Sequence, residues 1–168
     1  MPDEQTHERI RLIRDLTTHP PQPRDKQLRV MTPNDQAAVA AVLYDAYHGT
    51  IDDEGDTRED SLIEVRETMA GQYGPPVEQA CLVGVDGDGR IVAAVITVIF
   101  DGEPLLAYVV TDPGHQHQGW ATALMEQALQ EVVEQGGTRA NLAVIVGNPA
   151  EALYGQLGFI RFEDLGTP

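Results

Sequence analysis

The segment with the clearest chemical potential is Gln116–Ala121, which lies between an apolar run ending at Thr111 and a stretch of helical character. From Trp120 onward the apolar residues recur every three or four positions, which predicts an amphipathic helix. The first turn of a helix carries backbone N–H groups without partners and partial positive charge, so it attracts anions. Gly119 has no side chain and lets a phosphate approach the backbone closely. The pattern therefore predicts a strand, a phosphate-binding turn and a helix.

This segment resembles the coenzyme A signature of the Gcn5-related N-acetyltransferases (GNAT), Gln/Arg-x-x-Gly-x-Gly/Ala, here Gln116-x-x-Gly119-x-Ala121. The preceding Pro113 and a second family-like segment at 148–159 strengthen the resemblance, which covers roughly residues 28 to 168. A strand, turn and helix that bind no ligand remain the alternative for so short a pattern, but the second segment in register favours the coenzyme interpretation.

The resemblance implies an α/β fold: a central twisted mixed β-sheet of about six strands flanked by about four helices, with two splayed parallel strands in the middle. It also implies acetyl-coenzyme A as cosubstrate, with the pantetheine arm in the gap between the splayed strands. The residues expected to bind the coenzyme are Val109, Val110 and Thr111 along the arm and Gln116, His117, Gln118, Gly119, Trp120, Ala121 and Thr122 at the pyrophosphate.

In such enzymes the acceptor amine attacks the thioester directly, and Tyr154 matches the position of the acid that protonates the leaving thiolate. A phenol with an ordinary pKa near 10 is protonated at neutral pH and can donate. The alternative is that the Tyr154 ring packs on the sheet. Asn148 is a further coenzyme contact, although Gly147 occupies the place where the family has its asparagine. The general base stays open among Glu103, Asp101, His48, Glu64 and Asp112.

Neither of the two candidate metal-binding patterns fits a metal. The cluster Asp52-Asp53-Glu54-Gly55-Asp56 lacks the ligand spacing of an EF-hand. It is either a solvated acidic loop or an acidic lip over the acceptor site. His115 and His117 flank the phosphate-binding turn, so we expect them to face solvent or phosphate. The sequence predicts no metal.

The composition of the chain limits the kinds of partner and the compartment that we expect. The 168 residues carry a net charge of −16, with a pI near 4.4, which argues against a nucleic-acid partner and is compatible with a cationic substrate or with solubility alone. The single cysteine, Cys81, suits a reducing cytoplasm. The N-terminus does not resemble a signal peptide, and the longest apolar run is too short to span a membrane. We therefore expect a cytoplasmic protein without a membrane partner.

The chain divides into an N-terminal appendage with a Pro-rich linker, 1–27, and a GNAT domain, 28–168. In the appendage, Ile10, Leu12, Ile13 and Leu16 predict one side of a short helix. The remaining pattern predicts strands at 28–31, 80–85, 91–100, 105–111, 140–146 and 159–162, and helices after 34, over 62–72 and over 149–157.

After residue 162 too few residues remain for the last strand that the family usually adds. Because an exposed sheet edge invites pairing, we expect a homodimer in which a partner's strand or N-terminal segment covers it. The predicted function is transfer of an acetyl group from acetyl-coenzyme A to a primary amine of a small molecule or peptide, with cationic amines among the expected acceptors. The rivals are a non-catalytic acyl-coenzyme A sensor and a purely structural domain. Tyr154 favours catalysis, and Gly119 argues against a purely structural domain.

Overall fold

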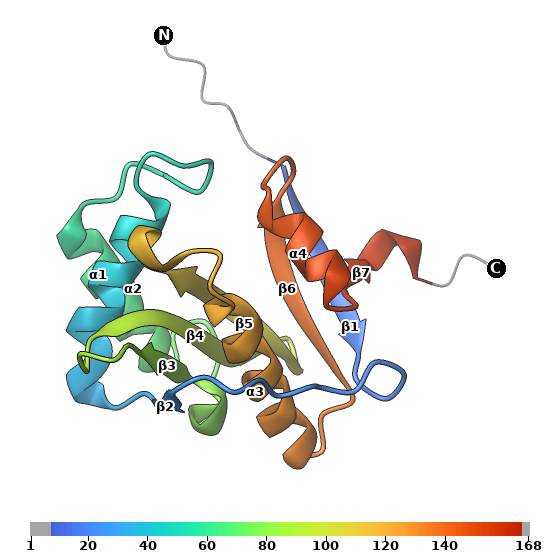
Figure 1. The fold of residues 1–168 in the computed structure, drawn as a ribbon. Helices are drawn as coiled ribbons and strands as arrows, with labels where there is room; N and C mark the ends of the chain where they lie inside the picture. The colour runs from blue at the N-terminus through green and yellow to red at the C-terminus, as the bar shows by residue number, and fades with distance from the viewer. Residues whose placement is uncertain (1–7, 166–168) are drawn as a thin grey trace, which may run out of the picture.

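The computed structural model describes residues 8–165, which form a seven-stranded mixed sheet with four helices (Figure 1). The strand order across the sheet is β2-β3-β4-β5-β6-β1-β7. The strands are β1 (Arg9–Asp15), β2 (Leu28–Val30), β3 (Leu82–Val85), β4 (Ile91–Phe100), β5 (Glu103–Thr111), β6 (Arg139–Ile145) and β7 (Ile160–Arg161). The helices are α1 (Gln36–Tyr47), α2 (Arg58–Met69), α3 (Trp120–Glu134) and α4 (Ala150–Gln156). The predicted α/β architecture is confirmed.

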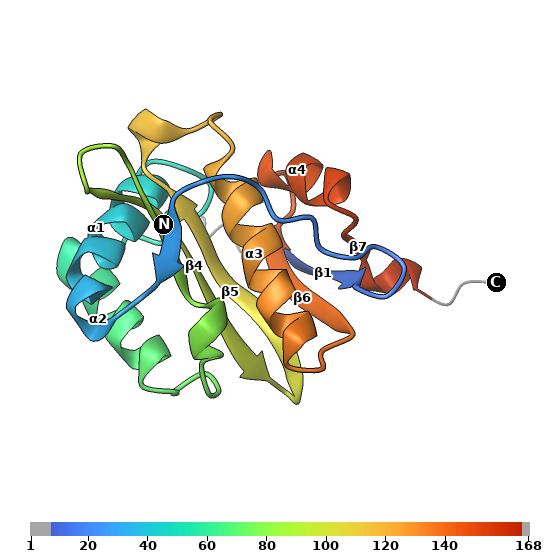
Figure 2. The ribbon, with the colours of Figure 1, turned by 60° about the horizontal axis from the view of Figure 1, so that its bottom comes forward.

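Two apolar cores lie on opposite faces of the sheet. On one face, α3 packs through Leu124 and Leu129 against side chains such as Val92 of β4. On the other face, α1 and α2 cover residues such as Ala94 and Ile96 of the same strand. The continuous apolar run of β4 is explained by this arrangement, because a central strand with both faces covered needs no polar alternation. Figure 2 shows α3 lying across its face of the sheet.

The parallel strands β5 and β6 separate after a single paired position, Leu105 opposite Asn141. The pairing of β4 with β5 also shifts between Ile96 and Thr97, which leaves Ala107 as an extra residue on β5. Beyond this point β6, β1 and β7 turn away from β3–β5, as Figure 1 shows. The predicted splay and the parallel crossover through α3 are confirmed, and the edge of β5 toward β6 is left without a strand partner over Val109–Thr111 in the described chain.

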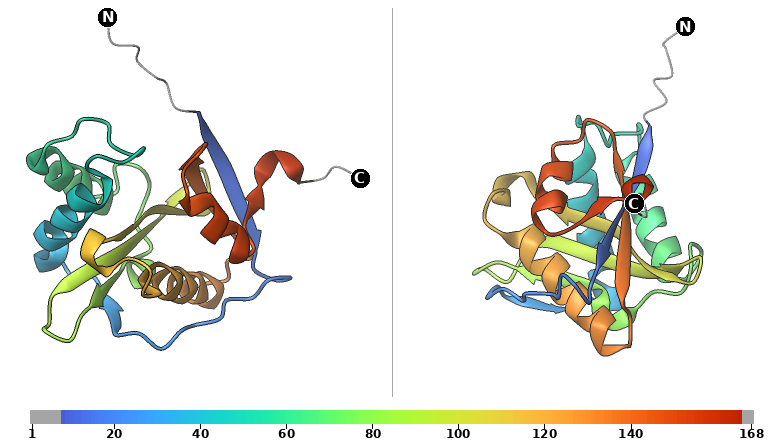
Figure 3. Two further views of the ribbon diagram at one scale, coloured as in Figure 1. Left: turned by 45° about the horizontal axis from the view of Figure 1, so that its top comes forward. Right: turned by 90° about the vertical axis from the view of Figure 1, so that its right-hand side faces the viewer.

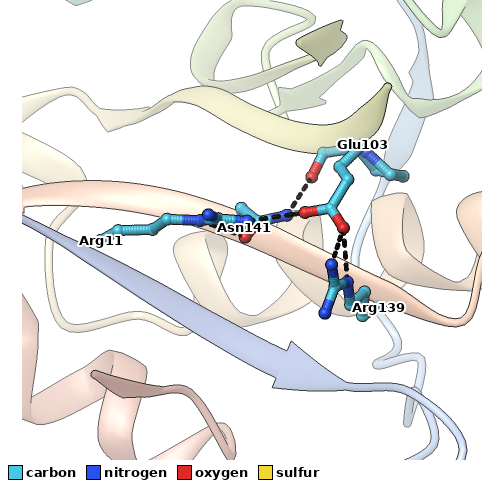
Figure 4. Close-up of polar contacts among 5 residues, drawn as sticks. Arg11, Glu103, Arg139 and Asn141 are labelled. Carbon is cyan, nitrogen blue, oxygen red and sulfur yellow. Dashed lines mark hydrogen bonds and ion pairs between the residues drawn. The ribbon is translucent and has the colours of Figure 1, made fainter. Parts of the chain in front are cut away.

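A polar cluster holds the closed end of this splay (Figure 4). Asn141 Nδ2 donates to Glu103 Oε2 at 2.9 Å, and Arg11 Nη2 donates to the same oxygen at 2.6 Å. Arg139 Nε donates to Glu103 Oε1 at 2.6 Å. The cluster therefore joins β5, β6 and β1 where the first two still pair.

The helix predicted for Ile10–Leu16 is wrong, because Arg9–Asp15 is strand β1. It pairs antiparallel with β6 along its whole length, from Arg9 opposite Ile145 to Asp15 opposite Arg139, and β7 pairs with its other edge. The apolar spacing suits either structure, and the free edge of β6 decides in favour of a strand. Arg9–Asp15 of the predicted appendage is thus part of the sheet; residues 1–7 lie outside the described chain.

Strand β1 also occupies a sheet edge at which the sequence predicted a partner from a second subunit. The strand covers the edge of β6 from within the same chain, while β7 is reduced to two residues and followed by a 3-10 turn, Phe162–Asp164. Because β1 covers this edge of β6, the argument that a second subunit must cover it no longer applies. The homodimer stays a prediction, without support from an exposed edge there.

The linker from β1 to β2 is fastened across α3 (Figure 3). Arg14 Nη1 forms a buried ion pair with Glu126 Oε1 of α3 at 2.6 Å, and the same guanidinium donates to the carbonyls of His19 and Pro20. The backbone N–H of Gln22 donates to Glu126. A buried charge pair that satisfies its remaining hydrogen bonds in this way fixes one arrangement of the chain.

Two smaller features complete the fold. Helix α2 begins at Arg58, four residues before the predicted start, because Thr57 and Asp60 form a capping box at its N-terminus. No helix within residues 8–165 is long and apolar enough to cross a membrane.

Candidate active site

A cavity of about 650 Å³, which we call the donor groove, opens between the separated strands. Its walls are the end of β5, the turn before α3, the first residues of α3, the middle of β6 and the start of α4. All the predicted coenzyme residues line it except Gln118, which is exposed outside it. The predicted residues that line the groove are Val109, Val110, Thr111, Gln116, His117, Gly119, Trp120, Ala121, Thr122, Asn148 and Tyr154.

The turn before α3 is held by a left-handed glycine and by side-chain hydrogen bonds. Gly119 precedes the helix with φ 85°, a left-handed backbone that a residue with a side chain rarely adopts. Upstream, the Asp112 carboxylate accepts from the backbone of Gly114 at 3.1 Å and lies 2.9 Å from His115 Nδ1. The hydrogen bond from His115 lowers the pKa of Asp112. The first turn of α3, whose N–H groups lack intrahelical partners, therefore borders the groove behind a turn of defined geometry.

Trp120 forms part of the floor of the groove. Its ring lies so close to β3 that a Cβ on Gly84 would fall 2.7 Å from Trp120 Cε3. The indole is 7% exposed, and its Nε1 is buried without a hydrogen-bond partner among the described residues. The wall of the groove thus includes a residue whose buried polar atom is left unsatisfied by the described chain.

Tyr154 enters the groove from α4. Its ring packs edge-on against Phe159, with centroids 6.4 Å apart, so it has a packing role as well as a place in the groove. Burial, together with the charge of Asp52, raises the pKa of Tyr154 to about 12. Its hydroxyl is therefore protonated at every physiological pH.

A second cavity of about 370 Å³, the acceptor pocket, shares Tyr47, Asp52 and Ala143 with the donor groove. It lies between α1, α2, β5, β6 and the 48–56 loop. Acidic and aromatic side chains from several elements line it: Asp52, Asp53, Glu54, Asp56, Glu64, Tyr44, Tyr47, Tyr73, Phe100 and Tyr108. The geometry thus agrees with the acidic-lip interpretation of the 52–56 cluster.

Asp52 stands where the two cavities meet. It accepts a hydrogen bond from Asn148 Nδ2 at 3.0 Å, and Asn148 Oδ1 in turn accepts from the backbone of Ala150 at 3.0 Å. Burial raises the pKa of the Asp52 carboxyl above its usual range, although the Asn148 bond lowers it in part. The amide of Asn148 is thus engaged with Asp52 as well as bordering the groove.

Sequence reasoning missed Asp52 as a candidate base and included residues that lie elsewhere. Glu103 is at the closed end of the splay: burial raises its pKa, but hydrogen bonds from Arg139 and Asn141 outweigh this and lower it. Asp101, in the turn between β4 and β5, and Asp112 line neither cavity. The acidic run was visible in the sequence, but which of its carboxylates faces the groove depends on the loop's path.

Two of the predicted bases do line the acceptor pocket. Glu64 accepts a short hydrogen bond from the Tyr108 hydroxyl, and burial, together with Glu64, raises the pKa of Tyr108. His48 stacks on Tyr44 with ring centroids 5.0 Å apart, and its Nδ1 lies 3.7 Å from Asp53 Oδ2. Both side chains therefore line the same pocket as Asp52.

The two histidines of the turn, His115 and His117, line the donor groove as expected. Over residues 8–165, the structure contains no group of three or more histidine, cysteine, aspartate or glutamate side chains placed to hold a metal ion. The absence of a metal remains a prediction.

Comparison with known proteins agrees with this geometry. A 73-residue stretch is 36% identical to the ribosomal protein bS18-alanine N-acetyltransferase of Escherichia coli K12, covering 43% of this chain and 49% of that protein. The chain thus matches about half the length of this curated relative.

Two solved structures have the same fold. A GCN5-related N-acetyltransferase from Sphaerobacter thermophilus superposes with a TM-score of 0.72 at 19% identity, over 91% of this chain and 48% of that one. The E. coli S18-alanine N-acetyltransferase superposes with a TM-score of 0.62 at 23% identity, over 81% of this chain and 78% of that one. The model of the acetyltransferase (GNAT) family matches residues 43–159, which include both cavities' central residues. The chain therefore belongs to the acetyltransferase (GNAT) family.

Proposed function

We propose that this protein is an N-acetyltransferase that moves the acetyl group of acetyl-coenzyme A to the primary amine of a cationic small molecule or peptide. The observation that carries the proposal is the junction of the two cavities. A groove with anion-binding backbone groups and a pocket with acidic walls meet at Asp52, beside the protonated Tyr154.

The donor groove suits a pantetheine arm and a pyrophosphate. The free edge of β5 over Val109–Thr111 offers strand-like hydrogen bonds to the amide groups of the arm. The N-terminus of α3 offers N–H groups and positive charge to the phosphates, and Gly119 leaves them room. A backbone N–H near Val109 would stabilise negative charge on the thioester oxygen, as in an oxyanion hole.

The acceptor pocket suits a positively charged amine. Among the described residues, Arg9 is the one arginine or lysine that lines it, and Arg9 pairs with Glu54. The remaining carboxylates attract a cation, and the aromatic faces stabilise one further through cation–π contact. The E. coli relative is named for an alanine of a ribosomal protein, so a peptide N-terminus belongs to the acceptors that we propose.

The reaction balances because the nitrogen loses two protons, one to Asp52 and one through Tyr154 to the leaving sulfur. The bound ammonium gives one proton to the Asp52 carboxylate, and the neutral amine then attacks the thioester carbon to form the new C–N bond. As the C–S bond breaks, the leaving sulfur takes a proton from Tyr154, which receives the second proton of the nitrogen. Because the pKa of Tyr154 exceeds that of a thiol, about 8.5, Tyr154 acts as a relay and does not stay ionised. Asp52 finally releases its proton to solvent.

The rival is a domain that binds an acyl-coenzyme A without reaction. Such a domain needs the donor groove but has no use for a carboxylate and a protonated phenol at the junction with a second pocket. The placement of Asp52 and Tyr154 therefore favours catalysis. Activity in the cytoplasm, without nucleic acid, membrane or metal, stays a prediction from composition and family resemblance.

The test is a panel of amines assayed for release of the coenzyme thiol in the presence of acetyl-coenzyme A. We expect turnover with amines that carry a further positive charge and with peptide N-termini, and little turnover with matched neutral or acidic amines. Tyr154→Phe serves as the inactive control. Binding of acetyl-coenzyme A without turnover of any amine class would support the sensor instead.

A further inference from the structure

The linker between β1 and β2 carries the single lysine of the chain, Lys26, to the start of α3. One end of the linker is fixed by the buried Arg14–Glu126 pair, and the other continues into β2 at Leu28. Figure 2 shows the linker crossing over the N-terminal half of α3. The path of the linker is thus set by the fold, and it brings one cation against Gly119 and Trp120, two residues that line the donor groove.

Lys26 lies against both residues that open α3. Its Nζ is 4.6 Å from the centroid of the Trp120 ring, and its Cε is 3.8 Å from the position of a Cβ on Gly119. Lysine is a flexible point charge with three donors, so its ammonium reaches from the indole face to an anion seated at Gly119 by a change of side-chain rotamer.

The charge of Lys26 is uncompensated. In a chain with 27 acidic residues, no ion pair of Nζ occurs within the described range. Most arginines, by contrast, are paired: Arg9, Arg11, Arg14, Arg29, Arg58, Arg139 and Arg161. Lys26 thus holds an ammonium without a counter-ion against the first residues of α3, whose N-terminal N–H groups add positive charge. This pairing of positive groups points to an anionic ligand that the chain itself does not supply.

We infer that Lys26 is a coenzyme-binding residue that forms an ion pair with a phosphate of the coenzyme. The inference rests on the proposed function, because it takes the coenzyme as the ligand of the donor groove. A net charge of −16 repels a polyanionic nucleotide, and one unpaired cation at the phosphate end offsets part of that repulsion. The phosphate is either the diphosphate or the 3′-phosphate, which share this chemistry.

The chain provides its own probe, because Trp120 is its single tryptophan and lies under Lys26. Titration with coenzyme A is followed by Trp120 fluorescence and repeated by calorimetry for the wild type, Lys26→Gln and Lys26→Arg. We expect Lys26→Gln to bind about 10-fold or more weakly, as expected for loss of a charge-assisted contact, and Lys26→Arg to stay close to the wild type. The affinity of Lys26→Gln should also depend less on salt.

Arg66→Gln is the matched control, because Arg66 is exposed on α2, forms no ion pair within the described range and has the same charge to lose. A phosphate-free acetyl-pantetheine should bind the wild type and Lys26→Gln equally. Dephospho-coenzyme A assigns the phosphate: if the Lys26 effect persists with it, the partner is the diphosphate, and if the effect vanishes, the partner is the 3′-phosphate.

Two failures are distinguishable. Equal coenzyme affinity of the wild type and Lys26→Gln would overturn the role of Lys26 and leave the proposed function standing. A wild type that binds no coenzyme at millimolar concentration would overturn the proposed function together with this inference.

Discussion

The donor groove and the acceptor pocket are built from different parts of the chain. The groove depends largely on the contiguous 109–122 segment and on its backbone groups, to which α4 adds Tyr154. The pocket is made from side chains of β1, α1, the loop after it, α2, β4, β5 and β6. A site made by backbone groups of one segment leaves a short sequence pattern, whereas a site made by scattered side chains leaves none.

The two regions also differ in charge. The groove combines the N-terminus of α3 with the unpaired Lys26, while the pocket presents Asp53, Asp56 and Glu64. On the proposed function, the anionic coenzyme and a cationic amine would be attracted to different ends and would meet at Asp52. Substitutions on the two sides should therefore separate coenzyme binding from amine use.

The largest effect is expected at Tyr154. Tyr154→Phe removes the hydroxyl and keeps the ring that packs on Phe159, so kcat should fall by about 1000-fold while the affinity for acetyl-coenzyme A stays within about twofold. Steady-state kinetics with calorimetry checks both. A kcat within threefold of the wild type would show that Tyr154 serves packing alone.

Asp52→Asn should lower kcat/KM by about 100-fold, because the amide accepts no proton. In the wild type, kcat/KM should fall as the pH drops through the raised pKa of Asp52. This acidic limb of the pH profile should vanish in the variant. The control is Asp53→Asn. The carboxylate of Asp53 accepts hydrogen bonds from the backbone N–H groups of Gly49 and Gly55. If Glu64→Gln loses the limb and Asp52→Asn keeps it, Glu64 is the base.

Replacing Asp52 should raise the stability of the fold although it lowers activity. Because the pKa of Asp52 is higher in the folded than in the unfolded protein, the folded state binds the proton more tightly. Stability therefore falls as the pH rises from the unfolded to the folded pKa, and the ionised form is the costly one at pH 7. Asp52→Asn should raise Tm at pH 7, with little gain at pH values below both pKa values. A Tm at pH 7 lower than that of the wild type would contradict this.

Gly84→Ala tests the floor of the donor groove. The added Cβ would fall within 3 Å of the Trp120 ring, so we expect a loss of about 1–3 kcal/mol in the free energy of unfolding, measured with urea. Coenzyme affinity should fall with it, since the ring must shift. Gly87→Ala is the matched control, because nothing lies within 4 Å of its added Cβ.

The smallest effect is expected from the rim of the acceptor pocket. Asp56→Asn should raise KM for a cationic amine about two- to threefold, with kcat and coenzyme affinity unchanged, because an exposed charge contributes little in water. The increase should shrink at high salt. An equal rise in KM for a neutral amine would show that charge is not the cause.

The sequence predicted the elements whose signal lies in a short stretch of consecutive residues. The glycine at 119, the apolar stripe of α3 and the apolar run of β4 are each visible within a short stretch of sequence. The strand β1, Arg9–Asp15, could not be identified in this way, because its partner, β6, lies more than 120 residues later. Asp52 was missed for a similar reason, since its contact with Asn148 spans 96 positions.

Calorimetric titration with acetyl-coenzyme A, for the wild type and for Gly119→Glu, tests the central claim most directly. We expect one binding site in the wild type and no binding in the variant, because a side chain at φ 85° is strained and its carboxylate repels the phosphates. Retention of full affinity by a folded Gly119→Glu, or no heat from the wild type at millimolar coenzyme, would contradict the assignment of the donor groove.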